Sequence, residues 1–245
     1  MNLMNEKPMK DWSDKEKVDA VREIFSKITP DYDRMNRIMS ARRDVAWRRF
    51  LVRRIPRDAQ QVLDVATGTG DVALMIARRR PEMRVTGLDF VQEMLDLAIA
   101  KTDRANLGDK IEYINGDAMS MPFNDSAFDA STIAFGMRNI PDRLGAIREM
   151  ARVVKPGGKV LILEMTFPRN LKMRKFFHWY LNRVIPMLGR FIAGNHSAYS
   201  YLSDSIQNFI HPDQLTDLFE QAGLLEIKEH PLTMGITYLH EGIVP

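Results

Sequence analysis

Short apolar segments alternate with helical patterns through the middle of this chain. The apolar segments cover residues 61–65, 85–88, 111–114, 128–134 and 159–163, and helical patterns begin near residues 71, 91 and 142. Such alternation is typical of an α/β fold in which helices cover both faces of a parallel sheet. Two later strands, at residues 225–229 and 237–240, would close one edge and give a mostly parallel sheet of seven strands.

The segment before this sheet has a different pattern. Residues 14–28 and 34–54 carry apolar residues at helical spacing, and Thr29-Pro30-Asp31 breaks the pattern between them. We therefore expect an N-terminal helical cap of two helices. The full length of 245 residues suits a single domain that carries such a cap.

Composition excludes several classes of protein. The 35 Lys and Arg against 32 Asp and Glu leave a net charge of +3, too small an excess to indicate a nucleic-acid binder. The absence of Cys rules out disulfides, thiolate zinc sites and cysteine nucleophiles, and the five scattered His residues predict no metal site. No apolar run approaches the roughly 18 residues that cross a bilayer. Residues 1–17 are polar, so we expect a cytoplasmic protein.

Positive charge gathers in two segments. Residues 42–57 include seven Arg residues. Residues 165–203 contain no acidic residue but six basic and eight aromatic ones. Cations interleaved with rings are typical of a surface that contacts anionic lipid headgroups, so we expect transient contact with a membrane surface. A packed helix with a solvated basic face is the alternative.

Glycines and acidic residues follow the first three predicted strands. Gly68-Thr69-Gly70 comes after the first strand, Asp89 and Phe90 after the second, and Asp117 after the third. Ligands of open parallel sheets bind beyond the carboxyl ends of the strands, where a glycine turn lets the backbone approach closely. These signals also fit a nicotinamide dinucleotide. Asp64, inside the first strand, favours instead a ligand with an amino-acid end and a positive sulfonium, which is S-adenosylmethionine.

Longer motifs surround these residues. Asp64–Asp71 (DVATGTGD), with Asp89, Asn115–Ala118 (NGDA) and Lys155–Gly158 (KPGG), resembles the class I S-adenosylmethionine-dependent methyltransferases. Further motifs resemble, in order, those of the UbiE family of ubiquinone/menaquinone biosynthesis C-methyltransferases: Tyr32–Asn36 with Met39-Ser40 and Trp47, Phe135–Asn139, Arg152–Glu164, and Tyr199–Leu202 with Ser205-Ile206. The resemblance spans residues 18–245. It departs from the family pattern at Asp44, Ala134 and Met165.

The resemblance implies a Rossmann-like class I methyltransferase fold in one domain. Residues 1–57 would form the cap, residues 58–164 the cofactor-binding half, and residues 165–245 a substrate-side insert with the closing strands. It also implies S-adenosylmethionine-dependent methylation of a ring carbon of a polyprenyl quinol, either demethylmenaquinol or a benzoquinol. The substrate should be the reduced quinol, because its ring carbon becomes nucleophilic when a hydroxyl of pKa about 10 loses its proton.

Site residues follow from the same motifs. We expect cofactor contacts from Asp64, Gly68, Thr69, Gly70, Asp89, Phe90, Asp117, Ala118 and Ala134, and substrate contacts from Tyr32, Asn36, Tyr199 and Tyr201. Arg138 would stabilise the phenolate, since Arg stays protonated, and Asn139 would orient the ring oxygen. The alternative for Arg138 is a structural ion pair with Asp142 or Asp33.

Other functions fit parts of this pattern. A methyltransferase acting on another phenolic small molecule would share the cofactor motifs. A nicotinamide-dependent oxidoreductase would share the glycine turn and the acid at residue 89. An idle relative serving as a scaffold in quinone synthesis would bind the cofactor without transferring a methyl group. The sequence leaves a homodimer open.

Overall fold

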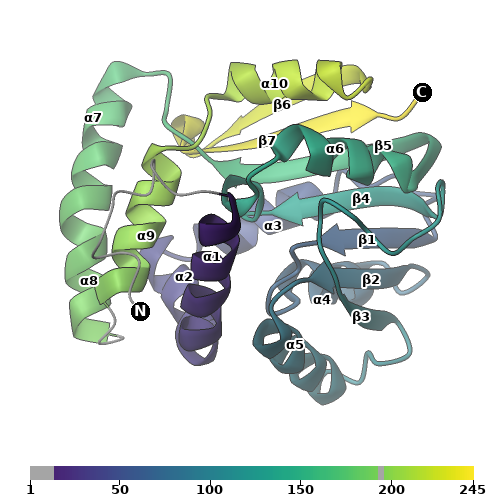
Figure 1. Ribbon diagram of the computed structural model, residues 1–245, viewed down its shortest axis with the longest axis horizontal. Helices are drawn as coiled ribbons and strands as arrows, with labels where there is room; N and C mark the ends of the chain where they lie inside the picture. The colour runs from purple at the N-terminus through teal and green to yellow at the C-terminus, as the bar shows by residue number, and fades with distance from the viewer. Residues whose placement is uncertain (1–13, 193–195) are drawn as a thin grey trace.

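The computed structural model describes residues 14–192 and 196–245, and its centre is a seven-stranded sheet (Figure 1). The strands run in the order β3-β2-β1-β4-β5-β7-β6. Their bounds are β1 (Gln61–Val65), β2 (Arg84–Asp89), β3 (Ile111–Asn115), β4 (Phe128–Ala134), β5 (Val154–Met165), β6 (Leu225–Leu232) and β7 (Thr237–Ile243). Strands β1 to β5 are parallel, whereas β7 is antiparallel to β5 and β6. The predicted mostly parallel, seven-stranded sheet is confirmed.

Side chains on successive strand residues enter two separate cores. Leu161 and Leu163 of β5 belong to the core with α3 (Arg43–Val52) and α4 (Asp71–Arg79). Val160 and Ile162 belong to the core with α6 (Arg143–Arg152) and α10 (Pro212–Gln221). Strand side chains alternate between faces, so an apolar strand is buried on both sides only when helices cover both. Helix α5 (Gln92–Arg104) lies beside β2 and β3.

The remaining helices lie beyond the carboxyl ends of the parallel strands. Figure 1 shows them on the side to which the arrows of β1 and β4 point. They are α1 (Asp14–Ile28), α2 (Tyr32–Met39), α7 (Leu171–Trp179), α8 (Ile185–Ile192) and α9 (His196–Gln207), with short turns η3 (Thr29–Asp31), η4 (Met137–Asn139) and η6 (Thr233–Gly235) and the π-helical η5 (Tyr180–Val184). The strand order reverses between β1 and β4, which is where open α/β sheets bind ligands.

Two local predictions are wrong. The single helix expected over residues 34–54 is two helices, α2 and α3, separated by a turn in which Ala41 and Arg42 have positive φ angles. The strand expected at residues 159–163 begins earlier, at Val154, so Pro156-Gly157-Gly158 lies inside β5, which has an irregular register against β4 near this point. The sequence pattern thus missed a break between two helices in the first place and the continuation of a strand through Pro and Gly in the second.

Candidate active site

The loop after β1 turns sharply into helix α4. Ala66, Gly68 and Gly70 all have positive φ angles. A Cβ on Gly70 would collide with the hydroxyl of Tyr113, so this position requires glycine for packing. A Cβ on Gly68 would meet no atom within 4 Å, and the Gly68 amide donates to the Asp89 carboxylate at 2.8 Å. The loop thus presents open space at Gly68 and a closed contact at Gly70.

A cavity of about 230 Å³ opens beyond the ends of β1, β2 and β4, and we name it the strand-end cavity. It is many times larger than the roughly 10–15 Å³ of cavity volume that one water molecule needs, so it has room for an organic ligand. Six of the predicted cofactor residues line it: Gly68, Asp89, Phe90, Asp117, Ala118 and Ala134. Asp89 is buried, which raises the pKa of its carboxyl, while amides of the loop and of Val91 donate to it.

A second, small cavity of about 20 Å³ lies under the same loop, and we name it the loop cavity. Its lining includes the predicted Asp64 and Thr69, whereas Gly70 lines none of the three cavities described for this site. Asp64 accepts hydrogen bonds from Thr67 at 2.6 Å and Thr132 at 2.8 Å. Burial raises the pKa of the Asp64 carboxyl to about 6, although both hydroxyls oppose this shift.

A third cavity of about 60 Å³ lies between the N-terminal cap and helices η5, α8 and α9, and we name it the cap cavity. Its wall is mainly apolar, with these residues: Met39, Trp47, Phe135, Met165, Leu181, Ile185, Leu202 and Ile206. The predicted Asn36 and Arg138 supply polar groups there. Tyr32 lines all three cavities, and Phe135 lines both the strand-end and the cap cavity. These two rings therefore form the boundary at which the cavities meet.

Arg138 forms a buried ion pair, but with a partner that the sequence did not predict. Its guanidinium donates to Glu164 of β5 at 2.7 Å. Burial lowers the pKa of Arg138, and the Glu164 carboxylate outweighs this effect, so the side chain stays cationic. The predicted partners lie elsewhere: Asp142 caps helix α6, and Asp33 accepts from Thr69 and Lys101. Arg138 also lines the cap cavity, so it borders the space for a ligand while it is paired with Glu164.

Asn139 and Tyr201 are joined by a hydrogen bond. The Tyr201 hydroxyl donates to the Asn139 side-chain oxygen at 2.9 Å, and burial raises the pKa of Tyr201 to about 12. Asn139 lines the strand-end cavity, not the cap cavity. Tyr201 lines none of the three cavities and packs against α1, so the structure does not bring it to the predicted substrate space. The side chain of Tyr199 lies outside the described part of the structure.

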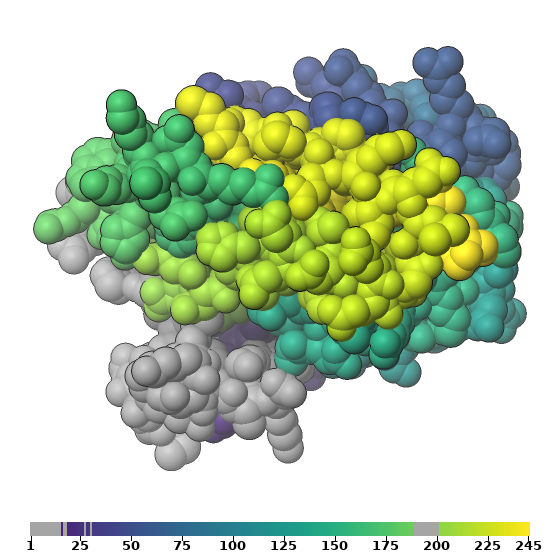
Figure 2. All heavy atoms as spheres, turned by 90° about the horizontal axis from the view of Figure 1, so that it is seen from above, coloured from purple at the N-terminus to yellow at the C-terminus, as the bar shows by residue number. Residues whose placement is uncertain are grey.

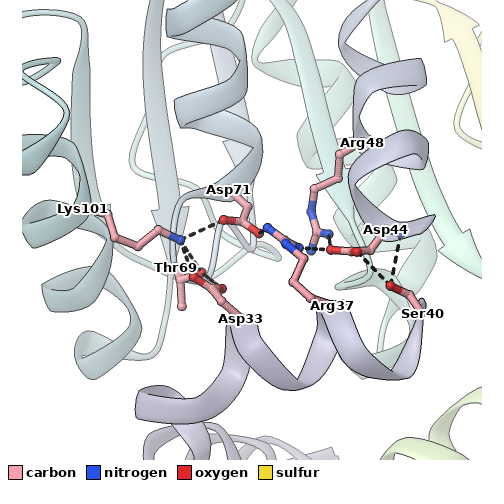
Figure 3. Close-up of polar contacts among 8 residues, drawn as sticks. All are labelled: Asp33, Arg37, Ser40, Asp44, Arg48, Thr69, Asp71 and Lys101. Atoms are coloured by element: carbon pink, nitrogen blue, oxygen red, sulfur yellow. Dashed lines mark hydrogen bonds and ion pairs between the residues drawn. The ribbon is translucent and has the colours of Figure 1, made fainter. Parts of the chain in front are cut away.

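A chain of alternating charges joins the cap to the loop (Figure 3). Lys101 of α5 contacts Asp33 of α2 and Asp71 of α4, and Arg37 of α2 bridges Asp71 and Asp44. Burial raises the pKa of Asp71, but nearby Arg and Lys side chains outweigh it and hold that pKa well below its usual range. Helix α2 is thus held against the first turn of α4, next to the loop cavity.

Two residues of this site were missed or misread from the sequence. Arg48 was counted within a basic surface segment, yet it is buried and lines both the loop and cap cavities. Its spacing of four residues from Asp44 on one helix was the available signal for an ion pair. Glu164 ended a recognised motif, but the sequence gives no indication that it faces Arg138. Among the described residues, no cluster of His, Asp and Glu could hold a metal ion.

The fold and the site together define the class of this protein. A parallel sheet with one antiparallel strand, β7, inserted between β5 and β6, a glycine loop after β1 and a cavity at the β1–β4 switch are the features of a class I methyltransferase. The ubiE/COQ5 methyltransferase family matches residues 10–244, and the chain belongs to this family. Membership decides against the nicotinamide-dependent oxidoreductase.

Curated relatives agree with this assignment over nearly the whole chain. The ubiquinone/menaquinone biosynthesis C-methyltransferase UbiE of Geotalea daltonii is 41% identical over 93% of this chain and 97% of its own length. The demethylmenaquinone methyltransferase of Geobacillus kaustophilus is 37% identical over 92% of this chain and 97% of its own length.

A solved structure supports the fold. A Thermotoga maritima protein described as an S-adenosylmethionine-dependent methyltransferase aligns with a TM-score of 0.66 at 16% identity, covering 91% of this chain and 99% of its own. The predicted Rossmann-like class I methyltransferase fold is confirmed.

Proposed function

We propose that this protein transfers the methyl group of S-adenosylmethionine to a ring carbon of demethylmenaquinol. The relatives from Geotalea and Geobacillus carry names that fit this reaction. The observation that supports it most directly is the meeting of two cavities at Tyr32 and Phe135. Methyl transfer is an in-line displacement that needs donor and acceptor about 3 Å apart, and cavities that adjoin at the same two residues place the two ligands next to each other, with Tyr32 and Phe135 at the edge of the contact.

The strand-end cavity suits the donor. Gly68 leaves room for close approach, and the Asp89 carboxylate has lone pairs beyond those used by the loop amides, so it can accept from ribose hydroxyls. Phe90 can pack on the adenine, and Asp117 can accept from its amino group. When bound, S-adenosylmethionine supplies an electrophilic methyl group on a positively charged sulfur.

The cap cavity suits the acceptor. Its apolar wall suits a quinol ring, and methionines such as Met39 and Met165 can change rotamer to widen the space for the ring and tail. Arg138 lowers the free energy of the phenolate, and its ion pair with Glu164 holds it in position. Asn139, oriented by Tyr201, contacts the ring oxygen from the donor side. The methyl group replaces a ring hydrogen, which leaves as a proton.

Single-turnover methyl transfer tests this function. Demethylmenaquinol and a demethylated benzoquinol would each be offered in reduced and oxidised form. We expect transfer to the reduced naphthoquinol, and transfer only to the benzoquinol would correct the substrate. Arg138→Gln should lower the transfer rate about 100-fold, as loss of one charge-stabilising donor does, with unchanged binding of S-adenosylhomocysteine. Asp89→Ala should instead weaken that binding. Full turnover by Arg138→Gln would contradict the catalytic role, and methylation of no quinol would refute the function.

A lipid substrate requires access from a membrane, and we propose that helices α7, η5 and α8 provide it. Phe177, Leu181 and Ile185 are buried on the inner face of this segment, where the last two line the cap cavity. The outer face exposes Phe176 (53%) and Trp179 (52%), whose ring centroids lie 5.9 Å apart. Figure 2 shows the α7 segment forming one end of the molecule. No helix of the described residues is long and apolar enough to span a bilayer.

The charge of this outer face favours an anionic lipid surface. Lys172, Lys175 and Arg183 are exposed on it, and residues 165–203 contain no carboxylate side chain to pair with them. Rings at the lipid boundary with cations facing the headgroups are the usual arrangement of an interfacial helix. The basic segment at residues 42–57 contributes less than predicted, because its Arg48 is buried. We propose a cytoplasmic protein that contacts the inner face of the cell membrane.

Vesicle sedimentation tests this contact. The protein should bind vesicles containing phosphatidylglycerol. Binding should fall as the salt concentration rises from about 0.05 to about 0.5 M, because salt ions then screen electrostatic attraction beyond a few ångströms. The double variant Phe176→Ser, Trp179→Ser should bind at least about tenfold more weakly, because it loses the apolar side-chain area that would be buried in the lipid. Leu225→Ser, equally exposed at 53% on β6, is the matched control and should bind normally. Two results would contradict the proposal: unchanged vesicle binding by the double variant, or a dimer in the wild-type protein that the double variant loses while its vesicle binding stays the same.

A further inference from the structure

Arg48 is a buried cation at the junction of the cap and the cofactor loop. It projects from α3, only 5% of it is exposed, and it lines both the loop cavity and the cap cavity. Figure 3 shows its guanidinium reaching Asp44 beside Arg37. Burying a cation costs free energy unless carboxylates balance its charge and acceptors bind its N–H groups. The partners of Arg48 therefore show which of its N–H groups remain for a ligand.

The described residues satisfy only part of this guanidinium. Asp44 accepts from Nη1 at 2.8 Å, and Asp44 is shared with Arg37. The Phe135 ring lies 5.0 Å away and stacks on the cation. Within the described part of the chain, Nε and Nη2 have no hydrogen-bond acceptor, although a guanidinium offers five N–H donors in a planar fork. The free edge of the fork is therefore available to a ligand in the adjoining cavity.

The loop cavity carries opposite charges on its lining. Arg48 contributes a cation, and Asp64 and Asp71 contribute carboxyl groups on which Arg48 acts electrostatically; Asp71 is also paired with Arg37 and Lys101. At about 20 Å³ the cavity can hold one small polar group but not a nucleoside. It shares Gly68, Ala66 and Ala134 with the strand-end cavity. A ligand lying in the larger cavity can therefore extend its end into the smaller one.

We infer that Arg48 binds the carboxylate of the amino-acid end of the methyl donor, while Asp64 faces its ammonium group. This inference rests on the proposed use of S-adenosylmethionine. Guanidinium and carboxylate pair through two parallel hydrogen bonds, which matches the unused edge of the Arg48 fork. Because Arg48 is a residue of α3, the cap would then contribute directly to binding of the methyl donor. The chain of charges from Lys101 to Asp44 holds α3 and α2 in the position this contact requires.

Ligands that differ in one group isolate the contact. S-adenosylhomocysteine carries the carboxylate, its decarboxylated analogue keeps only the ammonium, and 5′-methylthioadenosine lacks both. By calorimetry, the wild-type protein should bind the decarboxylated analogue about 10- to 100-fold more weakly than S-adenosylhomocysteine, the usual range for a charged hydrogen bond. Arg48→Gln should lose the same factor for S-adenosylhomocysteine and nothing for 5′-methylthioadenosine. Arg49→Gln, on the exposed side of α3, is the matched control and should change neither.

Each outcome decides the inference. Equal losses for all three ligands in Arg48→Gln would show a structural role and overturn it. Equal wild-type affinity for S-adenosylhomocysteine and its decarboxylated analogue would overturn it even if the variant failed to fold. A variant with normal binding but slow methyl transfer would place Arg48 on the acceptor instead. If the wild-type protein bound S-adenosylhomocysteine not at all, the proposed function itself would fail.

Discussion

At the scale of single residues, two glycines of one motif have different tasks. Both belong to the turn after β1 and both have positive φ angles. Gly68 borders open space in two cavities, whereas Gly70 packs against Tyr113 and Ala98 and lines none of the three. The sequence motif treats them alike as cofactor residues. Only the position of Tyr113, more than 40 residues away along the chain, separates the glycine that lines a cavity from the one that packs.

Gly70→Ala should therefore destabilise the fold more than an ordinary glycine replacement. The new methyl group would displace the Tyr113 hydroxyl and break its 2.9 Å hydrogen bond with Thr102. Together with the positive φ, we expect a loss of about 2–4 kcal/mol in the free energy of unfolding, measured in urea. Gly157 has a similar φ, +80° against +76° at Gly70, but a Cβ there would meet no neighbour, so Gly157→Ala should lose only about 1–2 kcal/mol. Equal losses in the two variants would contradict the packing role, and Tyr113→Phe should partly rescue Gly70→Ala.

At the scale of elements, the sequence predicted most of the sheet and missed the turn between α2 and α3. Strands such as β1 and β4 are short, apolar and bounded by turn residues, so neighbouring residues in the chain are enough to predict them. The α2–α3 turn contains Ala41 and Arg42 at positive φ, residue types that normally continue a helix. Hydrogen bonds from Ser40 and Arg37 to Asp44 span this turn and stabilise it.

The same distinction separates the predicted part of the site from the rest. Asp89, Phe90 and Asp117 were found because parallel strands bring their carboxyl ends to one edge, a rule that needs only strand positions. The Arg138–Glu164 pair and the burial of Arg48 depend on how the cap and β5 pack in three dimensions. The spacing of Arg48 from Asp44 indicates an ion pair, but neither charge nor spacing shows that this pair, or Arg138, is buried.

At the scale of the whole molecule, two buried groups on different strands give opposite pH dependences. Burial raises the pKa of Asp64 in β1 to about 6 and lowers the pKa of His240 in β7 to about 4. Asp64 binds its proton more tightly in the folded state, so its contribution is present at low pH and is lost as pH rises toward 6. His240 is neutral in the folded state, so its contribution is complete above about pH 6.5 and is lost as pH falls toward 4.

These contributions largely cancel between pH 4.5 and 6.5, and single variants should expose each of them. Asp64→Asn removes the group whose contribution to the stability of the folded protein falls as the pH rises. The increase in unfolding free energy from pH 4.5 to 6.5 should then exceed that of the wild-type protein by about 2 kcal/mol. His240→Gln should make the same increase smaller by a similar amount, because burial lowers the pKa of His240 more than Glu229 and the hydrogen bond to the Pro212 carbonyl raise it. Urea unfolding at both pH values measures these differences, and all other titrating groups are common to the three proteins. Parallel pH profiles for the two variants would contradict the assignment of opposite shifts, and with it the view that Asp64 keeps a raised pKa beneath the cofactor loop.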